Sequence, residues 1–157
     1  MPYSPAIVAN AVLYRAKQRG IRISHLKLQK LIFFIHAWRL ALQGLPAVDE
    51  RPEAWEYGPV FETLFHRLKN LGHEAICQYI ETVEARTNAY QALMPSIEDA
   101  AFWRILDQVM DRYGGLSASQ LSTLGHEPGG PWSTARAAKQ AVIPDDSIRS
   151  FYREKLQ

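Results

Sequence analysis

The sequence predicts a mainly α fold, a single compact bundle of about six to seven helices. Apolar residues recur at helical spacing through most of the chain, and Ser, Pro and Gly residues stand where helices would begin and end. One segment, about 24–43, is apolar around most of its circumference, as expected of a helix at the centre of a bundle. No internal repeat or linker divides the 157 residues, so we expect one domain over 1–157.

The first helix is predicted between Ser4 and Gly20. Ser4 is a favourable N-cap, and Pro5 suits the first helical position because its missing N–H would have no partner there. Lys17 and Arg19 precede the glycine, as is typical of a helix C-terminus. The apolar residues expected to face the core are Ile7, Val8, Val12 and Leu13.

The second helix is predicted over about 24–43, with Ser24 as its cap and Gly44 and Pro46 as terminators. At 100° per residue four of its polar side chains fall in a narrow stripe of roughly 40° of arc, with a fifth beside them, and the helix is apolar around most of its circumference. This stripe has two interpretations: a face in contact with water, or a groove floor where a partner segment satisfies the polar groups. Its members are His25, Gln29, His36 and Gln43, with Arg39 beside them.

Residues 45–58 are predicted to form an irregular connection, since Pro46 and Pro52 interrupt any helix. Pro59 then starts a third helix, in which apolar residues keep helical spacing up to Gly72. The connection and the helix start carry three large aromatic side chains, for which core packing and a place at the rim of an interface both stay open. They are Trp55, Tyr57 and Phe61.

The segment 73–94 has a weaker pattern. Apolar and polar residues alternate from Ile76 to Val83, which fits a short strand or a poorly marked helix. We expect an irregular segment with room for a short β-hairpin near 74–92.

Capping signals place the next two helices. The clearest helical pattern begins at Pro95 and ends before Gly114, with Asp99 at the capping-box position. Ser117 and Gln120 form a second capping box, which predicts a short helix after it.

Turn residues then divide the C-terminal part of the chain. The run 128–131, Pro-Gly-Gly-Pro, must form a turn. One or two helical turns are expected after it, with Ser133 as the cap. Pro144 and Asp145 begin the final helix.

Composition and charge favour a cytoplasmic protein. The formal net charge is only +2, and the basic residues show one modest cluster, which disfavours nucleic-acid binding. The single cysteine, Cys77, excludes an intrachain disulfide and fits a reducing compartment. The first residues lack the pattern of a signal peptide, and the longest apolar run, 31–35, is far too short to cross a membrane.

No motif predicts a metal site, a cofactor or a catalytic centre. His73 and Cys77 stand four residues apart, but a zinc site needs three or four ligands with a second close pair. Phosphate-binding glycine loops and nucleophile motifs are absent. The His126-Glu127 pair near Trp132 has two interpretations: a helix end in which the histidine binds terminal carbonyls and the tryptophan fills the core, or a binding or chemical role for the histidine.

Two blocks of the sequence carry a family resemblance. The first is the run 28–34 (LQKLIFF) with Trp38, followed by residues 53–60 (EAWEYGPV). The second is residues 121–132 (LSTLGHEPGGPW). Together they resemble the Panacea antitoxin domain family, also called SocA-like or phage-associated GepA-like. One departure is Gly125, where the family usually has Thr or Ser.

The resemblance implies a mainly helical antitoxin of a bacterial or prophage toxin–antitoxin system, with no enzymatic activity, that neutralises a co-encoded toxin by direct binding. It also implies an alternative, an adaptor that delivers the toxin to the ClpXP protease. A small enzyme using His126 and Glu127 is the second alternative, and a homo-oligomer stays open. The candidate partner-binding residues are His25, Gln29, His36, Arg39, Trp55, Tyr57, Phe61, His126 and Trp132.

Overall fold

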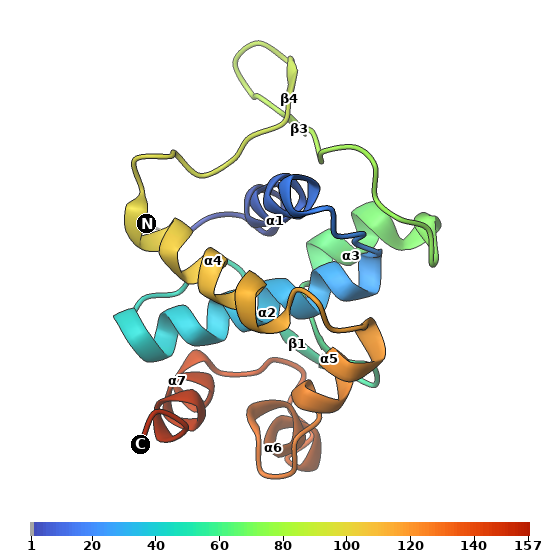
Figure 1. Ribbon diagram of the computed structural model, residues 1–157. Coiled ribbons are helices and arrows are strands. Elements are labelled where there is room, and N and C mark those ends of the chain that lie inside the picture. The colour runs from blue at the N-terminus through green and yellow to red at the C-terminus, as the bar shows by residue number, and fades with distance from the viewer. Residues whose placement is uncertain (1) are drawn as a thin grey trace.

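A long central helix runs through the molecule, and most of the other helices pack on its sides (Figure 1). The structure is a computed structural model that describes residues 2–157. The central helix is α2 (His25–Gln43). The helices that pack against it are α1 (Pro5–Arg19), α3 (Glu62–Leu68), α4 (Ala100–Tyr113), α5 (Ala118–Gly125) and α7 (Asp145–Glu154).

The remaining elements are short. The helix α6 (Pro131–Ala137) packs on α7, and the 3-10 helix η1 (Lys69–Leu71) extends α3. Two antiparallel hairpins complete the fold. Their strands are β1 (Glu53–Trp55) with β2 (Gly58–Val60), and β3 (Thr82–Val83) with β4 (Tyr90–Gln91). The predicted mainly α bundle is confirmed, and so is the short hairpin within 74–92.

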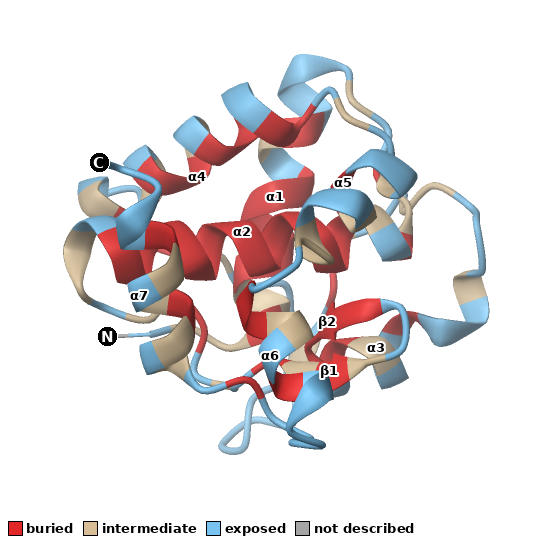
Figure 2. Cartoon of the chain, turned by 90° about the horizontal axis from the view of Figure 1, so that it is seen from below, coloured by how far each residue is buried: buried red, intermediate tan, exposed pale blue. Residues whose placement is uncertain are grey.

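Every residue of α2 from Leu28 to Ala41 is buried, so this helix is the centre of the core (Figure 2). Burial of its apolar side chains on several sides supplies the main driving force for folding. The predicted caps are also confirmed: the Ser24 side chain accepts a hydrogen bond from the backbone N–H of Lys27, and Gly44 ends the helix in the left-handed conformation.

An aromatic cluster joins α2 to α4 and α7. Phe34 stacks on Tyr113 with ring centroids 4.3 Å apart, and Trp38 donates its indole N–H to the Tyr113 hydroxyl at 2.8 Å. Tyr152 of α7 meets the Trp38 ring edge-on at 5.1 Å. These contacts bury large aromatic surfaces and also satisfy the buried indole, so they stabilise the packing of the three helices.

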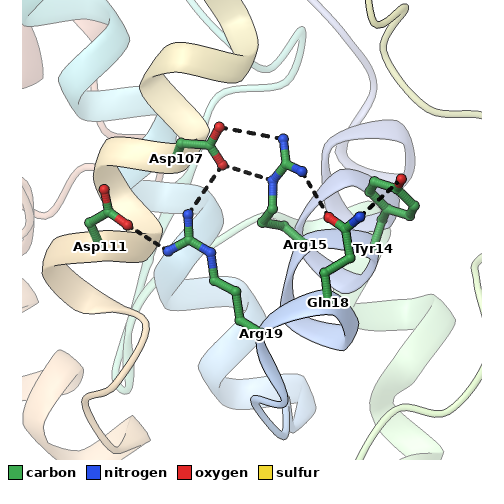
Figure 3. Close-up of polar contacts among 6 residues, drawn as sticks. All are labelled: Tyr14, Arg15, Gln18, Arg19, Asp107 and Asp111. Atoms are coloured by element: carbon green, nitrogen blue, oxygen red, sulfur yellow. Dashed lines mark hydrogen bonds and ion pairs between the residues drawn. The ribbon is translucent and has the colours of Figure 1, made fainter.

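Ion pairs connect α1 to α4 at the surface (Figure 3). Arg15 Nε lies 2.8 Å from Asp107, and Arg19 lies 2.6 Å from Asp111 and 3.4 Å from Asp107. Exposed pairs of this kind contribute at most about 1 kcal/mol each, so they orient α1 on α4 more than they stabilise it.

The prediction for residues 45–72 is wrong in two respects. Residues 53–60 form the β1–β2 hairpin rather than an irregular connection, and Pro59 lies in β2 opposite Ala54. The third helix therefore begins three residues later, at Glu62, with Phe61 as its N-cap. A tertiary contact explains the later start, because the side chain of Gln29 in α2 binds the backbone of Phe61.

Two further helix starts differ from the prediction. Asp99 is itself the N-cap of α4, accepting from the backbone N–H of Phe102 at 3.2 Å, so the helix begins at Ala100. The helix α6 begins at Pro131 with Gly130 as N-cap, because the Ser133 hydroxyl donates to the Glu127 carbonyl instead of capping. The Ser117–Gln120 capping box and the start of α7 at Asp145 are confirmed.

Candidate partner-binding site

The polar stripe of α2 is a buried seam. His25, Gln29, His36 and Arg39 are each at most 7 % exposed, and Gln43 is half-buried. Both interpretations of the stripe, as a face in contact with water and as an open groove floor, are therefore wrong for the folded chain. The chain's own segments cover the seam and bind most of its polar groups, as buried polar groups require. Nη1 of Arg39 is buried without a hydrogen-bond partner among the described residues.

Gln29 binds both backbone groups of one residue. Its amide nitrogen donates to the Phe61 carbonyl at 3.2 Å, and its amide oxygen accepts from the Phe61 N–H at 2.9 Å. This pair of bonds holds the end of the β1–β2 hairpin against α2 and fixes where α3 begins. Phe61 itself is fully buried, so it is a core residue.

His36 connects α2 to two other segments. Its Nδ1 accepts from the backbone N–H of Val48 at 3.2 Å, so its Nε2 carries the proton that bonds Asp145 at 2.9 Å. His25 lies 3.3 Å from the Gln29 amide, and burial lowers its pKa below the ordinary value. Arg39 donates to Gln43 at 3.2 Å.

Lys30 is a site residue that the sequence analysis missed. It is 1 % exposed, and its ammonium donates to the backbone carbonyl of Tyr57 at the turn of the β1–β2 hairpin. Burial lowers its pKa to about 8, because no water shell stabilises the charged form. The signal available was its place on the predicted central helix, away from the polar stripe and among apolar residues, which leaves little room for an exposed lysine.

Gly58 is required at the hairpin turn. Its φ of +112° disfavours any side chain, and a Cβ there would collide with Lys30 Nζ and lie 3.2 Å from the His126 ring. The close approach lets α2 and the end of α5 both contact the turn.

The hairpin also packs against the end of α5 and the start of α6. Trp132 donates its indole N–H to the Trp55 carbonyl at 2.6 Å, and the His126 and Trp132 rings lie 4.1 Å apart. His126 Nδ1 donates to the Ser122 carbonyl at 2.5 Å, which is the helix-end arrangement, one of the two interpretations of this histidine. Trp55 is half-buried and meets the Phe65 ring at 4.8 Å.

Glu127 does not contact the His126 ring. Its carboxylate pairs with Lys155 of the C-terminal segment at 2.9 Å. The two neighbouring residues therefore point to different partners, and within residues 2–157 they form no hydrogen-bonded acid–base pair.

The exposed part of this region is here called the hairpin surface: Glu56 and Tyr57 at the turn, with the hollow beside them. Tyr57 is 68 % exposed. The hollow has a volume of about 650 Å³. His126 lines the hollow and its ring also faces the Glu56 carbonyl, so the hollow lies next to the turn. The hollow is lined by Leu26, Ala118, Ser119, Ser122, Thr123, His126 and Pro128.

The structure thus brings Trp55, Tyr57, His126 and Trp132 together and separates them from the buried seam residues. Over the described residues, no group of three His, Cys, Asp or Glu side chains is placed to hold a metal ion. No helix in 2–157 is long and apolar enough to cross a membrane.

Residues 28–133 match the family described as "Antitoxin SocA-like, Panacea domain". The chain belongs to this family. The matched range runs from α2 into α6 and includes Lys30, Gln29, the β1–β2 hairpin, His126 and Trp132. The resemblance predicted from the sequence is therefore confirmed.

A curated relative is Antitoxin SocA of Caulobacter vibrioides, which is 33 % identical over 125 residues. The aligned region covers 80 % of this chain and 66 % of that protein, so the chain spans just under two thirds of the relative's length. No solved structure matches the chain.

Proposed function

We propose that the chain is an antitoxin that neutralises a co-encoded protein toxin by binding it directly. Membership of the SocA-like Panacea family supports the antitoxin role. The observation that carries the binding mode is Tyr57, a 68 % exposed aromatic side chain on a turn whose backbone is bound by the buried Lys30.

A fixed turn that displays an aromatic residue is well suited to binding. Aromatic side chains supply much of the energy at protein interfaces, mostly from positions near the centre of the contact. A turn that is already ordered loses little conformational entropy when a partner binds. Tyr57 and the neighbouring hollow would form the centre of a contact of about 800 Å² per partner, the size of a standard interface.

The test is co-expression with the toxin gene encoded beside this chain. Wild-type chain is expected to restore growth, and Tyr57→Ala is expected to weaken toxin binding at least about tenfold in calorimetry. Tyr90→Ala is the matched control, because Tyr90 is an equally exposed tyrosine (72 %) on the other hairpin. The control should bind as wild type does.

Two results contradict the proposal. If the wild-type chain does not bind the toxin, the antitoxin function is wrong. If Tyr57→Ala and Tyr90→Ala bind equally well, the hairpin surface is not the contact. Toxin levels measured in the same cells should stay unchanged, and a fall in them during protection would show degradation instead of inhibition by binding.

A further inference from the structure

A second surface, the α4–α7 groove, is a depression along α2 between α4 and the C-terminal end of the chain. Three residues at i, i+4 and i+8 on α2 form its floor: Phe34, Trp38 and Leu42. One part of the groove has a volume of about 230 Å³ and the other about 200 Å³. The walls are formed by Gln108, Val109, Arg112 and Tyr113 of α4 and by Tyr152, Lys155 and Leu156 at the C-terminal end.

Arg112 lies between the two parts of the groove and lines both of them. Its guanidinium carbon lies 5.4 Å from the ring centroids of both Trp38 and Tyr113. Within residues 2–157, no carboxylate forms an ion pair with Arg112. An arginine held against aromatic rings keeps its N–H donors free for a carboxylate, which it can bind with two parallel hydrogen bonds.

The charges that face the groove leave an excess of one positive charge. Lys155 is already paired with Glu127 at 2.9 Å, so Arg112 is the cation that lacks a partner there. Apolar side chains are exposed at both ends of the groove: Leu42 (46 %) and Leu156 (53 %) at one, Leu124 (42 %) at the other. The groove therefore offers one apolar pocket, beside Leu42 and Leu156, and a second pocket in which apolar side chains lie next to the Glu127–Lys155 pair. The unpaired positive charge of Arg112 lies between the two.

We infer that the α4–α7 groove binds a segment of the toxin in which an acidic residue lies between two apolar side chains. The inference rests on the proposed antitoxin function and names a second contact for the same partner. Each pocket takes one apolar side chain, and the carboxylate between them pairs with Arg112. Burial of the pair beside Trp38 strengthens it relative to an exposed pair, because water screens it less.

The groove and the hairpin surface lie on either side of the end of α5. His126 lines the hollow of the hairpin surface, and the next residue, Glu127, lines the groove. A single partner can therefore contact both surfaces across α5, which brings the combined contact towards the size of a stable interface.

The test is isothermal calorimetry, which measures the affinity of each variant of the chain for the purified, inactivated toxin. Arg112→Glu is expected to weaken binding at least about tenfold, since it places two negative charges in contact. Leu156→Asp, at an exposed position beyond α7, should weaken it by a similar factor through the apolar pocket. Arg112→Lys should lose less than Arg112→Glu, because it keeps the charge but not the two parallel bonds.

Arg104→Glu is the matched control. Arg104 is exposed on the same helix, the charge change is identical, and the residue lines neither pocket. This variant should bind within about twofold of wild type. Circular dichroism melts establish that each variant is folded before its binding is compared.

The outcomes separate the inference from the proposed function. If the wild type binds the toxin and both Arg112→Glu and Leu156→Asp bind it within twofold of the wild-type affinity, the groove is not a contact. The antitoxin function then stays in place. No binding by wild type overturns the antitoxin function and the inference with it. A dimer of the free chain that Arg112→Glu dissociates would show that a second copy occupies the groove, which also overturns the inference.

Discussion

The two β-hairpins of this protein differ in how they are held. In the β1–β2 hairpin, three backbone carbonyls accept hydrogen bonds from side chains that are distant in the sequence. Arg136 donates to Ala54, Trp132 to Trp55 and Lys30 to Tyr57. The backbone N–H of Ala54 also donates to the Ala141 carbonyl at 2.8 Å. The strands and the turn are therefore both fixed to the core.

By contrast, the β3–β4 hairpin is bound to the helices at its base, where residues 80 and 93 flank the two strands. The buried Asn10 of α1 donates to the carbonyls of Ile80 and Leu93, both at 2.9 Å, and accepts from the Ile80 N–H at 2.7 Å. Residues 83–91 are exposed and project away from the helices (Figure 1). Two strands of two residues each have little stability of their own.

The comparison separates two properties of a surface, the exposure of its side chains and the fixing of its backbone. Both hairpins expose a tyrosine, Tyr57 and Tyr90, to almost the same degree. Only the first presents it on a backbone that is bound from several sides, so only the first avoids a large entropy cost when a partner binds. This difference leads to the following predictions.

The largest expected effect is on the fixed turn. Gly58→Ala should lower the free energy of unfolding by about 3 kcal/mol, because alanine would be strained at a φ of +112° and its Cβ would force the buried Lys30 ammonium away from the Tyr57 carbonyl. Gly20→Ala is the control: Gly20 also has a positive φ, in the ordinary left-handed conformation, and nothing lies within 4 Å of the position that a Cβ would take there. It should cost about 1 kcal/mol in urea denaturation. Equal losses for the two variants would contradict the close packing of the turn.

The second effect concerns the base of the projecting hairpin. Asn10→Ala leaves two carbonyls and one N–H without their partner, which should cost about 2 kcal/mol. Limited proteolysis should then cleave faster within 81–94, while cleavage within 53–60 stays unchanged. Faster cleavage in both hairpins would show that Asn10 supports the whole fold and not this base in particular.

The third effect is a pH dependence from Lys30. Its folded-state pKa of about 8 lies below the unfolded value, so the unfolded chain binds more protons and stability rises with pH. Between pH 8 and 9.5 the free energy of unfolding should increase by about 1.5 kcal/mol through this group. Lys30→Met should flatten that rise in urea titrations. If the free energy of unfolding rises equally with pH in Lys30→Met, another group causes the rise.

The smallest effect is expected at the tip of the projecting hairpin. Replacing residues 85–88 with two glycines should change the free energy of unfolding by less than about 0.5 kcal/mol, because all four residues are exposed. Toxin neutralisation should also stay at the wild-type level. Loss of neutralisation by a stably folded variant would place the toxin contact on this hairpin.

The helices could be predicted from the sequence because their signals are local. Ser4, Ser24 and the Ser117–Gln120 box cap the helices as expected, since each cap bonds a backbone group within three residues. The β1–β2 hairpin could not be predicted in the same way. Its turn, Glu56-Tyr57, lacks the Asn-Gly or Asp-Gly pair typical of tight hairpins, and its strands are held by residues far away in the sequence.

The same limit applies to the candidate site. Helical periodicity correctly placed Gln29 and His36 on one face of α2, but it could not show which segments cover that face. Phe61, Val48 and Asp145 do so, and they come from three other parts of the chain. The candidate partner-binding set joined the aromatic residues near 55 and 132 to the polar residues of α2. The Trp132 indole donates to the Trp55 carbonyl, so these two residues do lie together, and their role in binding stays a prediction.

Hydrogen–deuterium exchange of the chain, free and bound to the toxin of the proposed function, tests most directly which hairpin binds. We expect slower exchange on binding at residues 55–58 and at the end of α5, 122–126, with no change at 83–90. Slower exchange confined to 83–90 would contradict the assignment of the toxin contact to the hairpin surface.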